Sequence, residues 1–140
     1  MMKKILIIIA TFQIFTFCQK DCKKPLSNIV KANNCIAALN PYQFSELLLR
    51  ENVQLVDVRT ILEYGYEHIA GSTNIDLYNA DFDLLLSSFK KSEPVLLYCA
   101  SGTRSEVAMN KIKEIGFSKV YHLDGGIRAW RSAELPLEKN

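Results

Sequence analysis

The segment of the sequence best suited to chemistry is LLYCASGTRSEVA, residues 96–108. An apolar run ends at Cys99, and small residues and Gly102 separate it from Arg104. Glycine adopts backbone angles that other residues resist, so the chain can curl here and point successive N–H groups inward. A helix starting near Ser105 adds its positive end to this anion site. Because a thiol in such a field ionises more readily, the pattern predicts that Cys99 is a nucleophile in a ring of amides.

Two other interpretations of these residues stay open from the pattern alone. Cys99 can be a buried cysteine that only ends a strand. Arg104 can hold a substrate anion or brace the loop, since a guanidinium serves both purposes. Nearby, Arg59 and Glu63 are expected to form a structural ion pair, and Asp57 is expected to order the backbone close to the loop.

The rest of the chain alternates between strand and helix patterns, which predicts how Cys99 is positioned. Strands are expected at 34–39, 53–59, 73–77, 94–99 and 119–123, and helices at 40–52, 78–92, 104–116 and 126–133, with a helical turn in 60–72. This alternation predicts an α/β fold with a central parallel sheet of about five strands and helices on both faces. Ligands of such folds bind beyond the carboxyl ends of the strands, where Cys99 lies.

The size and charge of the chain limit the classes of function. Its 140 residues suit one domain, and 49% hydrophobic residues suffice for a core. Lys3 and Lys4 account for the formal charge of +2, and from Cys18 onward the basic and acidic residues balance. We therefore expect no nucleic-acid partner and no electrostatic attraction to an anionic membrane surface.

The N-terminus has the layout of an export signal. Residues 1–18 combine Lys3 and Lys4 with an apolar stretch of about 14 residues, short of the roughly 20 that a membrane span needs. We expect an exported protein, in the periplasm or anchored to the membrane in the cell envelope of a bacterium, with an uncleaved anchor as the alternative. Cys18 is a candidate lipidation site and a candidate membrane tether. A polar tether is expected at 19–34 and the folded domain at 35–138.

Four cysteines are present, namely Cys18, Cys22, Cys35 and Cys99. Spare thiols of exported proteins tend to pair, so with Cys18 lipidated, Cys22 and Cys35 are a candidate pair and Cys99 is left free. The spacing of the cysteines does not match a zinc site, and no metal is expected.

Four ordered motifs within residues 35–138 resemble those of single-domain rhodaneses, members of the rhodanese-like sulfurtransferase family. The motifs are LVDVR (55–59), EYGYEHIAGSTNI (63–75), LYCASGTRS (97–105) and VYHLDGGIRAW (120–130). The resemblance implies a rhodanese-like α/β fold and a loop cysteine that takes a sulfur atom from a donor such as thiosulfate. The resulting persulfide passes that sulfur to a thiol or cyanide acceptor, in two displacements.

Carried onto this sequence, the resemblance makes Cys99 the nucleophile and persulfide carrier, without any cofactor, in a monomer. The residues that would hold the sulfur are Ala100, Ser101, Gly102, Thr103, Arg104 and Ser105. Ala100 stands where the family often has arginine, so we expect weaker binding of the doubly charged thiosulfate. His68 is expected to be a structural hydrogen-bonding residue, and His122 to be packed or exposed within its strand.

Two other functions compete with sulfur transfer. One is a non-enzymatic exported module that carries sulfur or binds a partner. The other is phosphate or arsenate chemistry on a related fold, whose loops place five residues between cysteine and arginine. Here only four residues separate Cys99 from Arg104, and a shorter ring suits a single sulfur atom better than a tetrahedral oxyanion.

Overall fold

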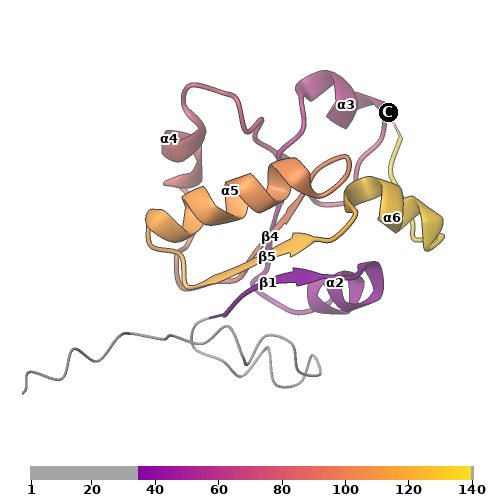
Figure 1. The fold of residues 1–140 in the computed structure, drawn as a ribbon, viewed down its shortest axis with the longest axis horizontal. Coiled ribbons are helices and arrows are strands. Elements are labelled where there is room, and N and C mark those ends of the chain that lie inside the picture. Colours follow the sequence, from indigo (N-terminus) through magenta and orange to yellow (C-terminus); the bar gives the residue numbers. More distant parts are fainter. Residues whose placement is uncertain (1–34, 140) are drawn as a thin grey trace, which may run out of the picture.

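The computed structural model describes residues 35–139. The predicted signal, the tether, Cys18 and Cys22 lie outside this range. The strands are β1 (Cys35–Leu39), β2 (Gln54–Asp57), β3 (Thr73–Asn74), β4 (Val95–Tyr98) and β5 (Lys119–Leu123). The helices are α2 (Pro41–Leu48), α3 (Ile61–Tyr66), α4 (Phe82–Leu86), α5 (Thr103–Glu114) and α6 (Gly126–Ser132). Figure 1 shows their arrangement around the sheet.

The five strands form one sheet in the order β1-β5-β4-β2-β3, and every neighbouring pair is parallel. The predicted α/β fold with a five-stranded parallel sheet is therefore confirmed. In the register of the three central strands, Leu97 of β4 lies between Val56 of β2 and His122 of β5. Because β4 is flanked on both sides, all four of its residues are buried, as its continuous apolar run requires.

Two apolar clusters lie on opposite faces of the sheet. Helices α2 and α6 supply Phe44, Leu47, Ile127 and Trp130 to the first cluster, which packs on Leu96 and Tyr98 of β4. Helices α4 and α5 supply Phe82, Leu86, Ala108 and Ile112 to the second, which packs on Val95 and Leu97. The alternation of β4 side chains between the clusters places helices on both faces, and Figure 1 shows α5 and α2 on opposite sides of the strands.

Local capping explains where two of the helices begin. Asn40 and Gln43 form a reciprocal capping box at α2, with Pro41 in the first helical position. Thr60 and Glu63 form a second capping box at α3. The second box matters for the site, because Glu63 also binds Arg104 in the first turn of α5.

The predicted helix at 78–92 and the predicted strand at 73–77 are both shorter in the structure, as α4 and β3. Side chains that bond to nearby backbone compete with helical hydrogen bonds at both ends of α4. The amide of Asp81 donates to the side-chain oxygen of Asn79, and the hydroxyls of Ser87 and Ser88 donate to carbonyls three residues earlier. Within α4, Phe82 and Leu86 are buried, whereas Leu85 is 42% exposed.

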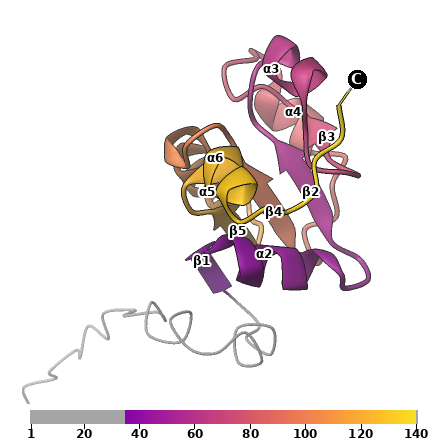
Figure 2. The same cartoon turned by 90° about the vertical axis from the view of Figure 1, so that its right-hand side faces the viewer.

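The C-terminal segment closes the fold over the region around α3. It runs from α6 past the sheet toward α3 (Figure 2), and His68 and Glu138 exchange backbone hydrogen bonds at 2.9 and 2.8 Å. The indole of Trp130 donates to the carbonyl of Pro136 at 2.9 Å. Within residues 35–139, no helix combines the length and apolar character needed to cross a membrane.

Candidate active site

Cys99 lies directly after β4 at the carboxyl edge of the sheet and is completely buried. The Gly102 amide donates a hydrogen bond to its Sγ at 3.1 Å. The Ser105 hydroxyl donates to the same sulfur atom at 3.6 Å. The amides of Ser101 and Ser105 also stabilise the sulfur. Donors from three positions of the loop therefore converge on one thiol.

These donors change the ionisation of the thiol. Burial by itself raises the pKa of Cys99, but hydrogen bonds from the amide and hydroxyl of Ser105 and from the amides of Ser101 and Gly102 outweigh it, so the pKa is lowered. The site thus favours the thiolate, which is the nucleophilic form of cysteine. Cys99 is also the free cysteine among the described residues.

The amides of the loop that follows Cys99 point inward because amides of α6 donate hydrogen bonds to the loop carbonyls on the outer side. The amide of Ile127 donates to the Cys99 carbonyl at 2.8 Å, and the amide of Arg128 donates to the Ala100 carbonyl at 3.3 Å. Gly126 makes this approach feasible, since a Cβ on it would lie 2.4 Å from the Cys99 carbonyl oxygen. The glycine pair that the sequence marks as a turn therefore also supports the loop.

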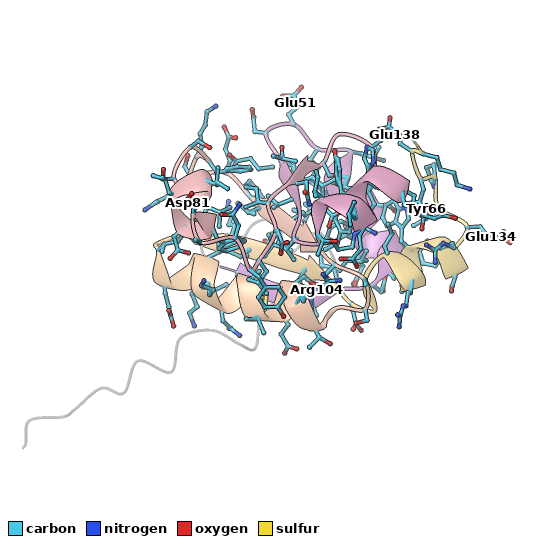
Figure 3. All side chains as sticks on the ribbon, turned by 90° about the horizontal axis from the view of Figure 1, so that it is seen from above. Glu51, Tyr66, Asp81, Arg104, Glu134 and Glu138 are labelled. Atoms are coloured by element: carbon cyan, nitrogen blue, oxygen red, sulfur yellow. The ribbon has the colours of Figure 1, made fainter. Side chains whose placement is uncertain are left out.

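Arg104, labelled in Figure 3, lies in the first turn of α5. Its guanidinium makes two hydrogen bonds to the Glu63 carboxylate, at 2.8 and 2.6 Å. These are the contacts that a brace requires, and a role of Arg104 in holding a substrate anion stays a prediction. The hydrogen bonds from Arg104 hold the pKa of Glu63 down, from its ordinary 4.5 to about 2.

The ion pair between Arg104 and Glu63 predicts a specific pH dependence of stability. Because the pKa of Glu63 is depressed, its contribution is complete above about pH 4.5 and is lost as the pH falls toward 2. Replacing Arg104 with methionine should lower the free energy of unfolding by about 1 kcal/mol at neutral pH, and by less near pH 2. Urea unfolding at several pH values measures this; an equal loss at pH 7 and pH 2 would contradict it. The matched control is Glu46→Gln at the exposed Glu46–Arg50 pair, with little effect at any pH.

The predicted ion pair between Arg59 and Glu63 is wrong. Arg59 instead pairs with Asp57, Nη2 to Oδ2 at 2.6 Å, and both side chains are buried. The Asp57 carboxylate also accepts the Arg59 amide at 2.8 Å, so it orders the backbone as expected. The spacing in the sequence does not tell whether Asp57 or Glu63 pairs with Arg59, because the partner is the carboxylate that is buried beside the guanidinium.

Breaking the buried Asp57–Arg59 pair should be costly. Asp57→Asn leaves the Arg59 guanidinium buried without its counterion, and we expect a loss of about 3–5 kcal/mol in the free energy of unfolding. Chemical denaturation measures the loss. Glu46→Gln at the exposed Glu46–Arg50 pair is the control, with a change of less than about 0.5 kcal/mol. A similarly small change for Asp57→Asn would refute the assigned role.

The two histidines have different surroundings. His68 stacks on Tyr64, and its Nδ1 lies 3.1 Å from the Tyr64 carbonyl, which are structural contacts. His122 is buried, and its Nδ1 lies 3.3 Å from the Ser105 hydroxyl, one contact away from the Cys99 sulfur. The sequence interpretation missed this proximity. The available signal was strand order: in a parallel sheet with β5 beside β4, His122 lies level with Leu97, two residues before Cys99.

The other predicted ring residues contribute in different ways. Ala100 offers its carbonyl to α6, Thr103 begins α5, and Arg104 binds Glu63. Cys35 is disulfide-bonded and belongs to the opposite edge of the sheet. It pairs with Lys119, and the register places Cys99 about five residues, or roughly 16 Å, further along the strands. In this fold, Cys35 is therefore too far away to attack a sulfur held on Cys99.

Comparisons with known proteins agree on the kind of domain. The family described as "Rhodanese-like domain" matches residues 40–133. Thiosulfate sulfurtransferase GlpE of Glaesserella parasuis serovar 5 is 30% identical over 100 residues, which are 71% of this chain and 91% of the relative. The protein of the same name from Pseudomonas paraeruginosa is 40% identical over 86 residues, 60% of this chain and 76% of the relative.

Solved structures give the same result for the fold. A rhodanese-like domain protein from Staphylococcus aureus superposes with a TM-score of 0.60 at 28% identity, over 67% of this chain and 90% of that one. A rhodanese-related protein from Thermoplasma volcanium superposes with a TM-score of 0.66 at 22% identity, over 74% of this chain and 99% of that one. At this lower identity the likeness concerns the fold alone.

Proposed function

Because the chain belongs to the rhodanese-like domain family, we propose that it is a sulfurtransferase that works through a persulfide on Cys99. The proposed donor is a sulfane-sulfur compound such as thiosulfate, and the proposed acceptor is a thiol or cyanide. The names of the GlpE relatives support the general class of activity. The observation that carries the proposal is the convergence of loop donors on a free thiol with a lowered pKa.

The reaction divides into two displacements. The Cys99 thiolate attacks the outer sulfur of thiosulfate; a new sulfur–sulfur bond forms to Sγ, and the bond inside thiosulfate breaks, with sulfite leaving with the electron pair. The thiolate of an acceptor, or cyanide, then attacks the outer sulfur of the persulfide. The bond to Sγ breaks, and Cys99 returns to the thiolate.

The amides of Ser101, Gly102 and Ser105 point at the position where negative charge resides in both forms of the enzyme. Hydrogen bonds from fixed backbone groups stabilise the thiolate and the persulfide without reorganisation during the reaction. The Glu63–Arg104 brace and the bonds from α6 keep these amides in place. Arg104 thereby acts on the loop geometry.

Mass spectrometry of the purified protein tests the proposal. After incubation with thiosulfate, the protein should gain about 32 Da, one sulfur atom, on the peptide that contains Cys99. Added cyanide should remove this mass and yield thiocyanate. An added sulfur that no acceptor removes would favour the carrier module instead, and the absence of any adduct with thiosulfate or an organic persulfide would refute sulfur transfer.

The proposal includes a location. We infer from residues 1–18 that the protein is exported to the bacterial cell envelope, with Cys18 as the candidate lipid attachment site. Fractionation of cells and labelling with a fatty acid test these points, with Cys18→Ser as the control. Label on wild type that Cys18→Ser lacks would support lipidation, and equal label on both would refute it.

A further inference from the structure

A buried histidine completes a chain of contacts that ends at the nucleophile. His122 of β5 is 6% exposed, and its Nδ1 lies 3.3 Å from the hydroxyl oxygen of Ser105. That oxygen lies 3.6 Å from the Cys99 sulfur and 2.9 Å from the Gly102 carbonyl oxygen. Ser105 is completely buried, and its hydroxyl lies in contact with these three protein groups.

Counting protons decides the direction of the hydrogen bond between His122 and Ser105. A serine hydroxyl has one proton to donate and two lone pairs that accept. The Gly102 carbonyl can only accept, and a Cys99 thiolate can only accept as well. If Nδ1 of His122 also accepted, it would take the single proton of Ser105 away from both. When Cys99 is a thiolate, the contacts of the Ser105 hydroxyl with the sulfur and with His122 can both be hydrogen bonds only if His122 carries hydrogen on Nδ1 and donates it to Ser105.

We propose that His122 is a positioning residue for Cys99: its Nδ1–H donates to the Ser105 hydroxyl and directs the hydroxyl proton toward the Gly102 carbonyl and the Cys99 sulfur. This inference deepens the proposed sulfur transfer and rests on it for its effect on turnover. When Cys99 is a thiol, the Ser105 hydroxyl donates its proton to the Gly102 carbonyl. When Cys99 is a thiolate or a persulfide, rotation about one bond brings the proton to sulfur.

The surroundings of His122 favour a neutral imidazole. Burial lowers its pKa, while the charges of Glu106 on α5 and Asp124 after β5 act in the opposite direction. The residues beside it in the sheet are apolar, Ala38 of β1 and Leu97 of β4. A neutral donor stabilises the sulfur anion through the orientation of one hydrogen bond and adds no net charge to the site.

The test compares variants that keep or remove the donor. His122→Leu fills the volume without a polar atom, whereas His122→Asn places an amide N–H near the position of Nδ1. The ionisation of Cys99 is followed by the ultraviolet absorbance of its thiolate as the pH rises, with Cys99→Ser as the baseline. This readout needs no reagent to enter the buried site.

We expect His122→Leu to raise the apparent pKa of Cys99 by about 0.5–1 unit and to slow sulfur transfer at pH 7 about fivefold, the scale of one hydrogen bond. His122→Asn should retain most of both values. Ser105→Ala removes the hydroxyl itself and should have at least as large an effect as His122→Leu, and the double variant should be no worse than Ser105→Ala alone, because His122 acts through Ser105.

The proposal is overturned if His122→Leu leaves the Cys99 titration unchanged, or if its effect adds fully to that of Ser105→Ala. Val120→Ala is the structural control, since Val120 lies on the same face of β5 and is completely buried. It should lower stability without moving the titration. Because the titration uses no sulfur donor, its result stays informative even if the protein proves unable to transfer sulfur.

Discussion

Replacing Cys99 with serine is expected to abolish sulfur loading and to lower the rate of sulfur transfer by at least about a thousandfold. A serine hydroxyl is nearly isosteric with the thiol, so the buried site should fold. It is not ionised near neutral pH, however, and it cannot form the sulfur–sulfur bond that holds the transferred atom. Mass spectrometry after incubation with thiosulfate, together with thiocyanate formation, measures both effects.

The matched control is Cys35→Ser. Cys35 begins β1 at the far edge of the sheet, and it is disulfide-bonded. Its replacement should cost stability, on the order of 2–4 kcal/mol for a lost disulfide, yet leave persulfide formation on Cys99 intact. Two outcomes would contradict the assignment of Cys99 as the sulfur carrier. One is a Cys99→Ser variant that still gains sulfur, and the other is a folded Cys35→Ser variant that gains none.

Replacing Gly126 with alanine should disable the site although the nucleophile Cys99 itself is unchanged. Gly126 has a φ of +59°, a left-handed conformation that a side chain makes costly. Its Cβ would also lie 2.7 Å from the Ala100 carbonyl carbon and from the Ser101 nitrogen. These atoms belong to the loop backbone, so the loop must shift. We expect a loss of about 2–4 kcal/mol in stability and at least about a hundredfold in transfer rate.

Denaturant unfolding and the transfer assay measure the two losses separately. Gly65→Ala is the control, because Gly65 lies within α3 and a Cβ there would meet nothing within 4 Å. That variant should be neutral or slightly more stable, since alanine favours a helix over glycine. A Gly126→Ala variant with normal stability and normal transfer would mean that α6 does not hold the loop.

The residue patterns predicted strands and helices correctly where a single local feature decided the secondary structure. The apolar run before Cys99 fits a strand buried on both sides, and α2 begins where Asn40 and Pro41 favour the start of a helix. The pattern failed at 78–92, where asparagine and serine side chains bond to the backbone in place of helical partners. A few local hydrogen bonds decide where the helix ends, and the spacing of apolar residues does not show them. The spacing therefore predicts a helix that is longer than α4.

Charged pairs were predicted less well than the elements. Glu63 lies four residues from Arg59 but is bound to Arg104, 41 residues away in the sequence. Arg59 forms its ion pair with Asp57 instead, and both side chains are buried, where an unpaired charge would be costly. Which acid pairs with which base depends on burial, and burial is a property of the packed chain.

The sequence by itself determined that a cysteine follows a buried strand and that a glycine-containing loop of four residues leads from it to an arginine. Those features follow from local propensity and covalent spacing. Only the tertiary structure decided which groups converge on the sulfur. The bonds from α6 to the loop, the brace from Glu63 and the approach of His122 to Ser105 all join segments distant in sequence. The packing of α6 and the order of β4 and β5 in the sheet bring those segments together.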